Sequence, residues 1–136
     1  MPRPGNKGTR LTHVGLALGS IDVLLPLFRD VLQMSEVQIA DSDGARIAAV
    51  ASGESIVELL EPAEDNSPIA RFVNKRGPGI HHICLSVDDL DSSLERCSAA
   101  GIRLIDSSPR LGAEGKRIAF LHPGSTGGIL IELSEY

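Results

Sequence analysis

Two histidines and two glutamates occupy equivalent places in two similar stretches of this 136-residue chain. His13 and His82 are 69 residues apart, and Glu58 and Glu132 are 74 residues apart. Imidazole and carboxylate groups together suit divalent metals such as Zn, Mn, Fe, Co or Ni. We therefore predict that these four residues form one metal site at the axis that relates two copies of a repeated module.

The sequence around the two glutamates strengthens this prediction. Glu58 lies in SIVELLEP and Glu132 lies in GILIELSEY, and neither run contains a lysine or arginine. A carboxylate rarely occurs in such an apolar strand without a cationic partner. A single strand histidine is more often a core or surface residue than a ligand, so the prediction depends on the joint pattern of the four residues.

Other residues capable of chemistry have simpler structural explanations. His81 is adjacent to His82 and should point to the opposite face of a strand. His122 precedes a Pro-Gly turn and should hydrogen-bond the backbone there. Cys84 is expected to be a small apolar filler, and the acidic run from Asp88 to Asp91 suits the start of a helix.

The strands that carry the histidines show the alternation of a half-buried sheet. In LTHVGLAL and in GIHHICLSV, large apolar residues alternate with the histidine and small residues. The alternation predicts two modules, each with the order strand, helix and three strands, at about 10–62 and 79–136. A linker helix at about 66–77 joins them. We expect residues 1–8 to be a flexible leader and residues 9–136 to form a single domain.

Local signals place the remaining elements. Ser20 can cap a helix that reaches Gln33, although Pro26 should kink or divide it. Ser67 and Pro68 predict the start of the linker helix, and Gly77 its end. The remaining predictions are strands at 34–40, 44–51 and 55–61, a helix from Asp88 or Asp89 to 100, strands at 102–106, 117–121 and 129–134, and a loop at 107–116.

Composition excludes several classes of protein. The formal net charge of −5 argues against nucleic acid as a partner, since phosphate backbones bind basic surfaces. No apolar run is long enough to span a membrane. Two cysteines, both expected inside elements, indicate reduced thiols and a cytoplasmic protein. Few aromatic residues are present, which argues against a site that stacks planar ligands.

At these motifs the chain resembles the vicinal oxygen chelate (glyoxalase/bleomycin resistance) superfamily, and within it the methylmalonyl-CoA epimerase family. The resemblance covers about 10–136. It implies an α+β fold in which two βαβββ modules form one curled-sheet domain around a metal cleft. The metal ligands that it implies fall on the same four residues. The motifs are THVGLAL, VELLEP, NSPIARFV, GIHHICLSVDD, GAEGKRIAFLHP and GGILIEL.

The resemblance implies epimerisation of (2R)- and (2S)-methylmalonyl-CoA through an enolate formed by metal-assisted removal of the C2 proton. A divalent ion is expected, with Co²⁺ favoured and Ni²⁺, Mn²⁺ or Zn²⁺ also compatible with the ligands. The expected partner is an acyl-CoA substrate, with no nucleic acid or membrane, and the family suggests a homodimer. Lys116 and Arg117, near the glycine-bearing loop, are candidates to contact CoA phosphates, but solvent-exposed charges are the expected default for both residues.

One position departs from the family pattern. Some members carry a glutamate base on the third strand together with a glutamine at the place of Glu58, whereas this chain has Ile47 at the third-strand position. Our hypothesis is that Glu58 serves both as metal ligand and as catalytic base. Glu132 would then be the catalytic group on the opposite face of C2.

Three other functions remain open from the sequence. A lactoylglutathione lyase (glyoxalase I) would use an equivalent set of two His and two Glu residues. A dioxygenase of this superfamily would use two His and one carboxylate, so the fourth ligand counts against it. A metal-free small-molecule-binding module of the same fold would lack the four ligands and would offer aromatic walls.

Overall fold

The computed structural model describes residues 8–136, which divide into two compact units. The middle unit is His13–His81. The terminal unit combines the N-terminal residues up to Thr12 with His82–Tyr136. Apart from Gly8, the predicted leader lies outside the described residues, and the prediction of a single domain from 9 to 136 stays a prediction.

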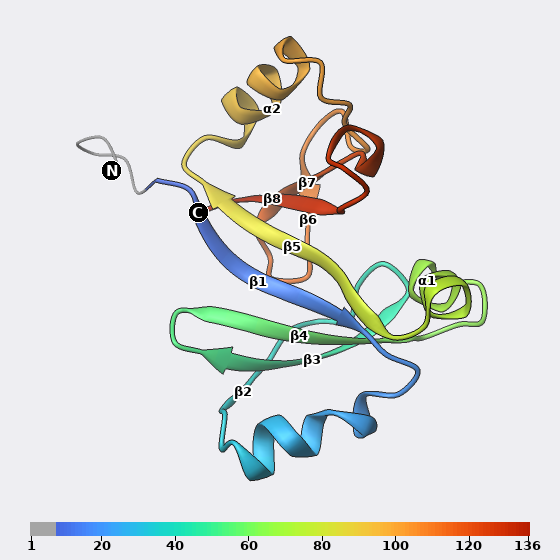
Figure 1. The fold of residues 1–136 in the computed structure, drawn as a ribbon. Helices are drawn as coiled ribbons and strands as arrows, with labels where there is room; N and C mark the ends of the chain where they lie inside the picture. Colours follow the sequence, from blue (N-terminus) through green and yellow to red (C-terminus); the bar gives the residue numbers. More distant parts are fainter. Residues whose placement is uncertain (1–7) are drawn as a thin grey trace. The chain divides into compact units, whose positions relative to one another are not determined.

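The sheet of the middle unit has the strand order β2-β3-β4-β1 (Figure 1). Strands β1 and β4 are parallel, whereas β3 is antiparallel to both β2 and β4. Apolar side chains on one face of this sheet, among them Val50 and Leu59, form a buried cluster with Leu25. The strands are β1 (Arg10–Ala17), β2 (Glu36–Val37), β3 (Ala45–Ser52) and β4 (Ser55–Pro62).

The predicted helix at 20–33 is divided, as Pro26 suggested. A 3₁₀ turn, η1 (Ile21–Val23), is capped by Ser20, and a π-helical turn, η2 (Leu27–Val31), follows with Pro26 at its N-cap. Proline lacks an N–H and its ring clashes with the preceding turn, so it kinks or breaks a regular α-helix at this position. The segment still provides the helical element between β1 and β2.

The linker helix α1 (Pro68–Arg76) has the predicted ends. The Ser67 side chain accepts a hydrogen bond from the Ala70 N–H at 3.1 Å. Gly77 follows the helix with a φ of 78°, a left-handed conformation that favours glycine. Ile69 packs in a buried cluster with Ala17 and two other residues of the sheet.

The terminal unit has the strand order β5-β8-β7-β6. Strands β5 and β8 are parallel, and the other neighbouring pairs are antiparallel. Helix α2 (Leu90–Ala99) buries Leu90 and Leu94 in a cluster with Leu121 and Leu133. The strands are β5 (Gly79–Val87), β6 (Arg110–Leu111), β7 (Arg117–Leu121) and β8 (Ile131–Glu135), with a 3₁₀ turn η3 (Pro123–Ser125).

Each module therefore runs strand, helical segment and three strands, which confirms the predicted α+β class with two βαβββ modules. None of the helices within residues 8–136 combines the length and hydropathy that a membrane crossing requires.

One predicted strand is wrong. Residues 102–106 form only an isolated bridge between Leu104 and Leu121, and the edge strand is β6, inside the predicted loop. The side chain of Asp106 explains the change, since its Oδ2 accepts the Phe120 N–H at 2.8 Å. The Phe120 N–H is therefore bound by a side chain and does not donate to a backbone carbonyl of a neighbouring strand.

Candidate active site

The middle unit brings His13 and Glu58 together. Glu58 on β4 is directly opposite Gly15 on β1, two residues after His13, so the histidine and the glutamate share one face of the sheet. The Nε2 of His13 lies 3.5 Å from the Oε1 of Glu58. Both residues are buried.

The terminal unit repeats this arrangement with His82 and Glu132. Glu132 on β8 is directly opposite Cys84 on β5, two residues after His82. The Nε2 of His82 lies 3.3 Å from the Oε1 of Glu132, and both residues are buried. The internal repeat inferred from the sequence therefore extends to strand register and side-chain geometry.

The donor atoms in each pair suit a divalent metal ion. Burying a carboxylate in an apolar sheet is costly unless a cation or hydrogen-bond donors compensate it. Each unit places an imidazole nitrogen next to such a carboxylate, and nitrogen and oxygen ligands of this kind bind Zn, Mn, Co or Ni. Since the pairs belong to different units, the predicted four-residue ligand set remains a prediction.

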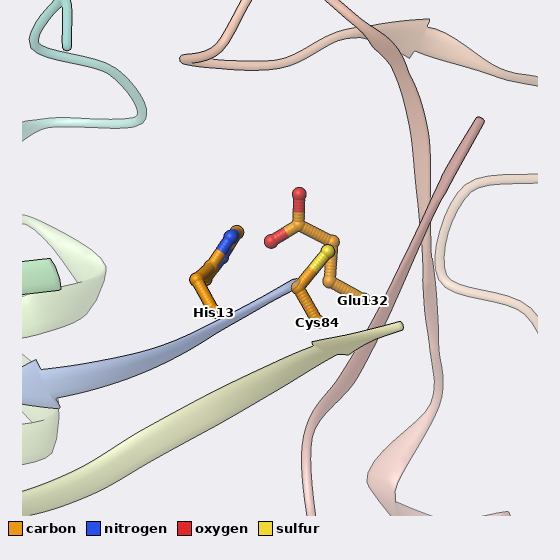
Figure 2. Close-up of side chains that lie close together, drawn as sticks. All are labelled: His13, Cys84 and Glu132. Carbon is orange, nitrogen blue, oxygen red and sulfur yellow. The ribbon is translucent and has the colours of Figure 1, made fainter. Parts of the chain in front are cut away.

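Cys84 lies beside the Glu132 carboxylate on the same face of the sheet. Its Sγ is within 4.8 Å of a carboxylate oxygen of Glu132 (Figure 2). The side chain is fully buried, in agreement with its expected role as a filler. Its position next to the acid is a feature that the sequence did not show.

The structural roles expected for other residues agree with their contacts. His81 packs edge-on against the ring of Phe72 at 5.1 Å between centroids. The Nδ1 of His122 accepts the Gly124 N–H at 2.9 Å and caps η3. Asp89 is the N-cap of α2, and hydrogen bonds from Ser92 lower the pKa of its carboxyl group.

Ile47 occupies the histidine face of the middle unit. It lies opposite Leu60, while its neighbour two positions on, Ala49, lies opposite Glu58. Ile47 packs against the apolar cluster that contains Ala17 and Leu60. The third strand therefore presents an aliphatic side chain where some family members carry a glutamate.

Sequence reasoning missed three linked residues, of which the first, Phe120, contacts His82. Phe120 on β7 is opposite Glu132, and its ring lies 5.9 Å from the His82 ring in an edge contact. The guanidinium of Arg110 lies 5.6 Å from the centre of the Phe120 ring. Asp106 binds both the Arg110 side chain and the Phe120 backbone. The sequence shows a basic residue at 110, but it predicts a loop at 107–116 and therefore does not predict which face of a sheet Arg110 belongs to.

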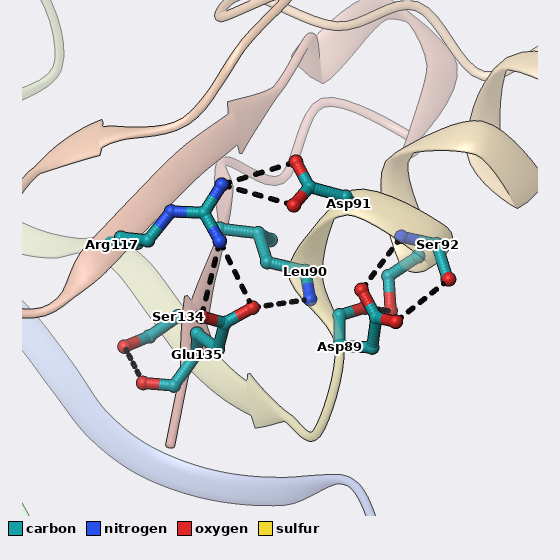
Figure 3. Close-up of polar contacts among 8 residues, drawn as sticks. Asp89, Leu90, Asp91, Ser92, Arg117, Ser134 and Glu135 are labelled. Atoms are coloured by element: carbon teal, nitrogen blue, oxygen red, sulfur yellow. Dashed lines mark hydrogen bonds and ion pairs between the residues drawn. The ribbon is translucent and has the colours of Figure 1, made fainter.

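Arg117 points away from the histidine face. Its guanidinium contacts the carboxylates of Asp91 and Glu135 at 3.1 Å, and Glu135 also accepts the Leu90 N–H (Figure 3). The hydrogen bond with Asp91 is the largest cause that raises the pKa of Arg117. This contact ties β7 to the start of α2, which gives the side chain a structural role.

Comparison with known proteins agrees with the fold and with the motifs. Residues 12–120 match the model of the Glyoxalase/Bleomycin resistance protein/Dioxygenase superfamily. A mitochondrial methylmalonyl-CoA epimerase from Dictyostelium discoideum is 38% identical over 129 residues, which cover 93% of this chain and 78% of that protein.

Two solved structures are similar over most of their length. The methylmalonyl-CoA epimerase of Mycobacterium tuberculosis has a TM-score of 0.86 and 38% identity, with coverage of 92% of this chain and 86% of that one. A methylmalonyl-CoA epimerase in complex with methylmalonyl-CoA and NH4+ has a TM-score of 0.86 and 31% identity, with coverage of 93% and 94%. The chain belongs to the methylmalonyl-CoA epimerase family of the Glyoxalase/Bleomycin resistance protein/Dioxygenase superfamily.

Proposed function

We propose that this protein interconverts (2R)- and (2S)-methylmalonyl-CoA by exchange of the proton at C2. The observation that carries the proposal is the pair of buried His–Glu contacts, repeated with the same strand register in both units, in a chain of the epimerase family. Relatives named as epimerases favour this reaction over that of a lactoylglutathione lyase.

We also propose that His13, Glu58, His82 and Glu132 hold one divalent metal ion, with Co²⁺ favoured and Ni²⁺, Mn²⁺ or Zn²⁺ also compatible. Two imidazoles and two carboxylates, all buried, form a donor set that suits these ions. A metal bound there would supply Lewis acidity toward the negative charge that develops on the thioester oxygen as the proton leaves.

The chain itself would move the protons through its two glutamates. Epimerisation needs a group on each face of C2, one to remove the proton and one to return a proton from the other side. We assign these roles to Glu58 and Glu132. Each carboxylate is buried in a largely apolar sheet, next to the imidazole of the histidine in its own unit.

The cross-strand neighbours of Glu58 support its double role as ligand and base. Glu58 has Gly15 on one side and Ala49 on the other, whereas Glu132 lies between Cys84 and Phe120. We infer that these small cross-strand neighbours leave the Glu58 side chain more room to rotate than Glu132 has. A carboxylate that must leave a metal to reach C2 needs such freedom.

Solvent exchange tests the reaction directly. The metal-loaded protein is incubated with (2S)-methylmalonyl-CoA in deuterated buffer, and the C2 proton is followed by NMR. We expect loss of the C2 proton signal together with formation of the (2R) isomer, and we expect a chelator to stop both. Persistence of the C2 signal with metal bound would reject the proposal.

The alternatives have their own readouts in the same experiment. Turnover of the hemithioacetal of methylglyoxal and glutathione, without C2 exchange, would indicate a lactoylglutathione lyase. Failure to bind any of the four metals would favour a metal-free binding module. The homodimer suggested by the family stays a prediction that sedimentation measurements can test.

A further inference from the structure

We propose that Arg110 binds the free carboxylate of the acyl group and so selects thioesters of dicarboxylic acids over those of simple acids. The inference rests on the proposed function, because it assigns a substrate group to a residue beside the same site. It concerns only residues of the terminal unit.

Strand register puts Arg110 on the histidine face. Arg110 on β6 lies opposite Ile118 on β7. Ile118 and Phe120 are two residues apart on one strand and so share a face, and Phe120 lies opposite Glu132. Arg110 therefore belongs to the face that carries His82 and Glu132. Arg117 is one residue from Ile118 and three from Phe120 on β7, so its side chain belongs to the opposite face.

Contacts with Asp106 and Phe120 orient the Arg110 side chain. Its Nε donates to the Oδ1 of Asp106 at 3.1 Å, and its guanidinium carbon lies 5.6 Å from the Phe120 ring centre. The other oxygen of Asp106 accepts the Phe120 N–H. One carboxylate thus fixes both the arginine and the ring beneath it, while 39% of the arginine side chain stays exposed.

The position of the charge indicates which anion it meets. A single aromatic ring, that of Phe120, contacts both the Arg110 guanidinium and the His82 imidazole. The acyl carboxylate of the proposed substrate is attached directly to C2, which is the reacting carbon. The phosphates of CoA lie at the far end of the long pantetheine arm, so a cation that shares the Phe120 ring with His82 suits the carboxylate.

The chemistry of arginine fits this role. A guanidinium presents planar, forked donors that match the two oxygens of a carboxylate. Contact with an aromatic face also orients the group without removing its charge. Arg110 would then hold the acyl carboxylate while C2 is presented to Glu132.

Arg117 provides a matched control. It lies seven residues away in the sequence, and 43% of its side chain is exposed, close to the value for Arg110. It contacts Asp91 and Glu135 on the side of α2. A loss of surface charge alone would affect the two arginine variants alike.

The test compares the binding of malonyl-CoA and acetyl-CoA, which differ by one carboxylate, to the metal-loaded protein by calorimetry. We expect the wild type to prefer malonyl-CoA. Arg110→Met should reduce this preference roughly ten- to a hundredfold, the range expected for losing a hydrogen bond between charged groups. Arg110→Lys should lose less of it, and Arg117→Met should leave it unchanged.

The outcomes separate the two proposals. If wild type and Arg110→Met prefer malonyl-CoA equally, Arg110 only fastens the β6–β7 hairpin and the inference is wrong. If the wild type itself binds neither thioester, the proposed function fails. Circular dichroism and the thermal midpoint of each variant show whether it is folded. Should Arg110→Met not fold, Arg110→Lys and Asp106→Asn provide the comparison, and unchanged preference in both would overturn the inference.

Discussion

The Nε2 of His82 lies 3.3 Å from the Oε1 of Glu132, although the two residues belong to the first and the last strand of the second module in sequence. The parallel pairing of β5 and β8 creates this contact, because it sets Glu132 opposite Cys84, two residues after the histidine. The same pairing of β1 and β4 creates the contact between His13 and Glu58. This repeated relationship underlies the first prediction.

Replacement of His82 should weaken metal binding. His82→Ala removes an imidazole ligand, so we expect the dissociation constant for Co²⁺ to rise at least about a hundredfold. Even changes to residues that only hydrogen-bond a ligand weaken metal binding by up to about a hundredfold. His122→Ala is the control, since His122 caps a 3₁₀ turn. Equal affinity of the two variants, measured by competition with a chelator, would remove His82 from the ligand set.

Glu58→Gln should separate metal binding from turnover. The amide oxygen can still bind a metal but cannot accept the C2 proton, so we expect Co²⁺ to remain bound while kcat falls roughly a hundred- to ten-thousandfold. Glu64→Gln, at an exposed position, should retain wild-type kcat. Full activity of Glu58→Gln in the NMR exchange assay would reject the double role of Glu58.

Glu61 should make the stability of the protein depend on acid pH. Its Oε1 accepts the Ile21 N–H at 2.9 Å, and its Oε2 pairs with Arg46 at 2.7 Å. The bond from Ile21 is the largest cause that lowers the pKa of Glu61 below its ordinary value of 4.5. Because the pKa is lower in the folded state, Glu61 stabilises the protein at pH values above the pKa that it has in the unfolded chain. This contribution is lost as the pH falls through the pKa of the folded state.

Urea unfolding of Glu61→Gln tests this dependence. At neutral pH we expect the variant to lose about 1 kcal/mol of unfolding free energy, because a charged acceptor is replaced by a neutral one. The difference from wild type should shrink as the pH is lowered from about 6 to about 3. Glu95→Gln, on the exposed side of α2, should show no such convergence. A difference that stays constant with pH would contradict the role assigned to Glu61.

Gly112→Ala should destabilise the β6–β7 hairpin. A Cβ at this position would lie 2.9 Å from two side-chain carbons of Ile118, which is buried. Relief of this overlap requires a shift of a packed side chain, so we expect the unfolding free energy to fall by roughly 1–3 kcal/mol. Gly79→Ala is the control, because a Cβ there meets nothing within 4 Å. Equal thermal midpoints for the two variants would show that Ile118 moves at little cost.

The local signals of the sequence were sufficient for most elements. Ser67, Pro68 and Gly77 set the ends of α1, and Asp89 caps α2 as expected. These signals are short-range, since a cap or a left-handed glycine acts within one turn of the chain. The predicted strand at 102–106 was wrong because its end depends on a hydrogen bond that the Phe120 N–H, 14 residues away, donates to the Asp106 side chain.

The sequence by itself indicated the repeat, the fold family and the four candidate ligands, because alternation along a strand assigns side chains to faces without knowledge of the neighbouring strands. The pairing of each histidine with the glutamate of its own module depends on the register of β1 with β4 and of β5 with β8. Tertiary structure alone decided which residues surround His82. Arg110, Asp106 and Phe120 meet through the register of β6, β7 and β8 and through long-range side-chain contacts. Register between strands distant in sequence is fixed by packing and pairing over the whole sheet, and no single stretch of the chain contains that information.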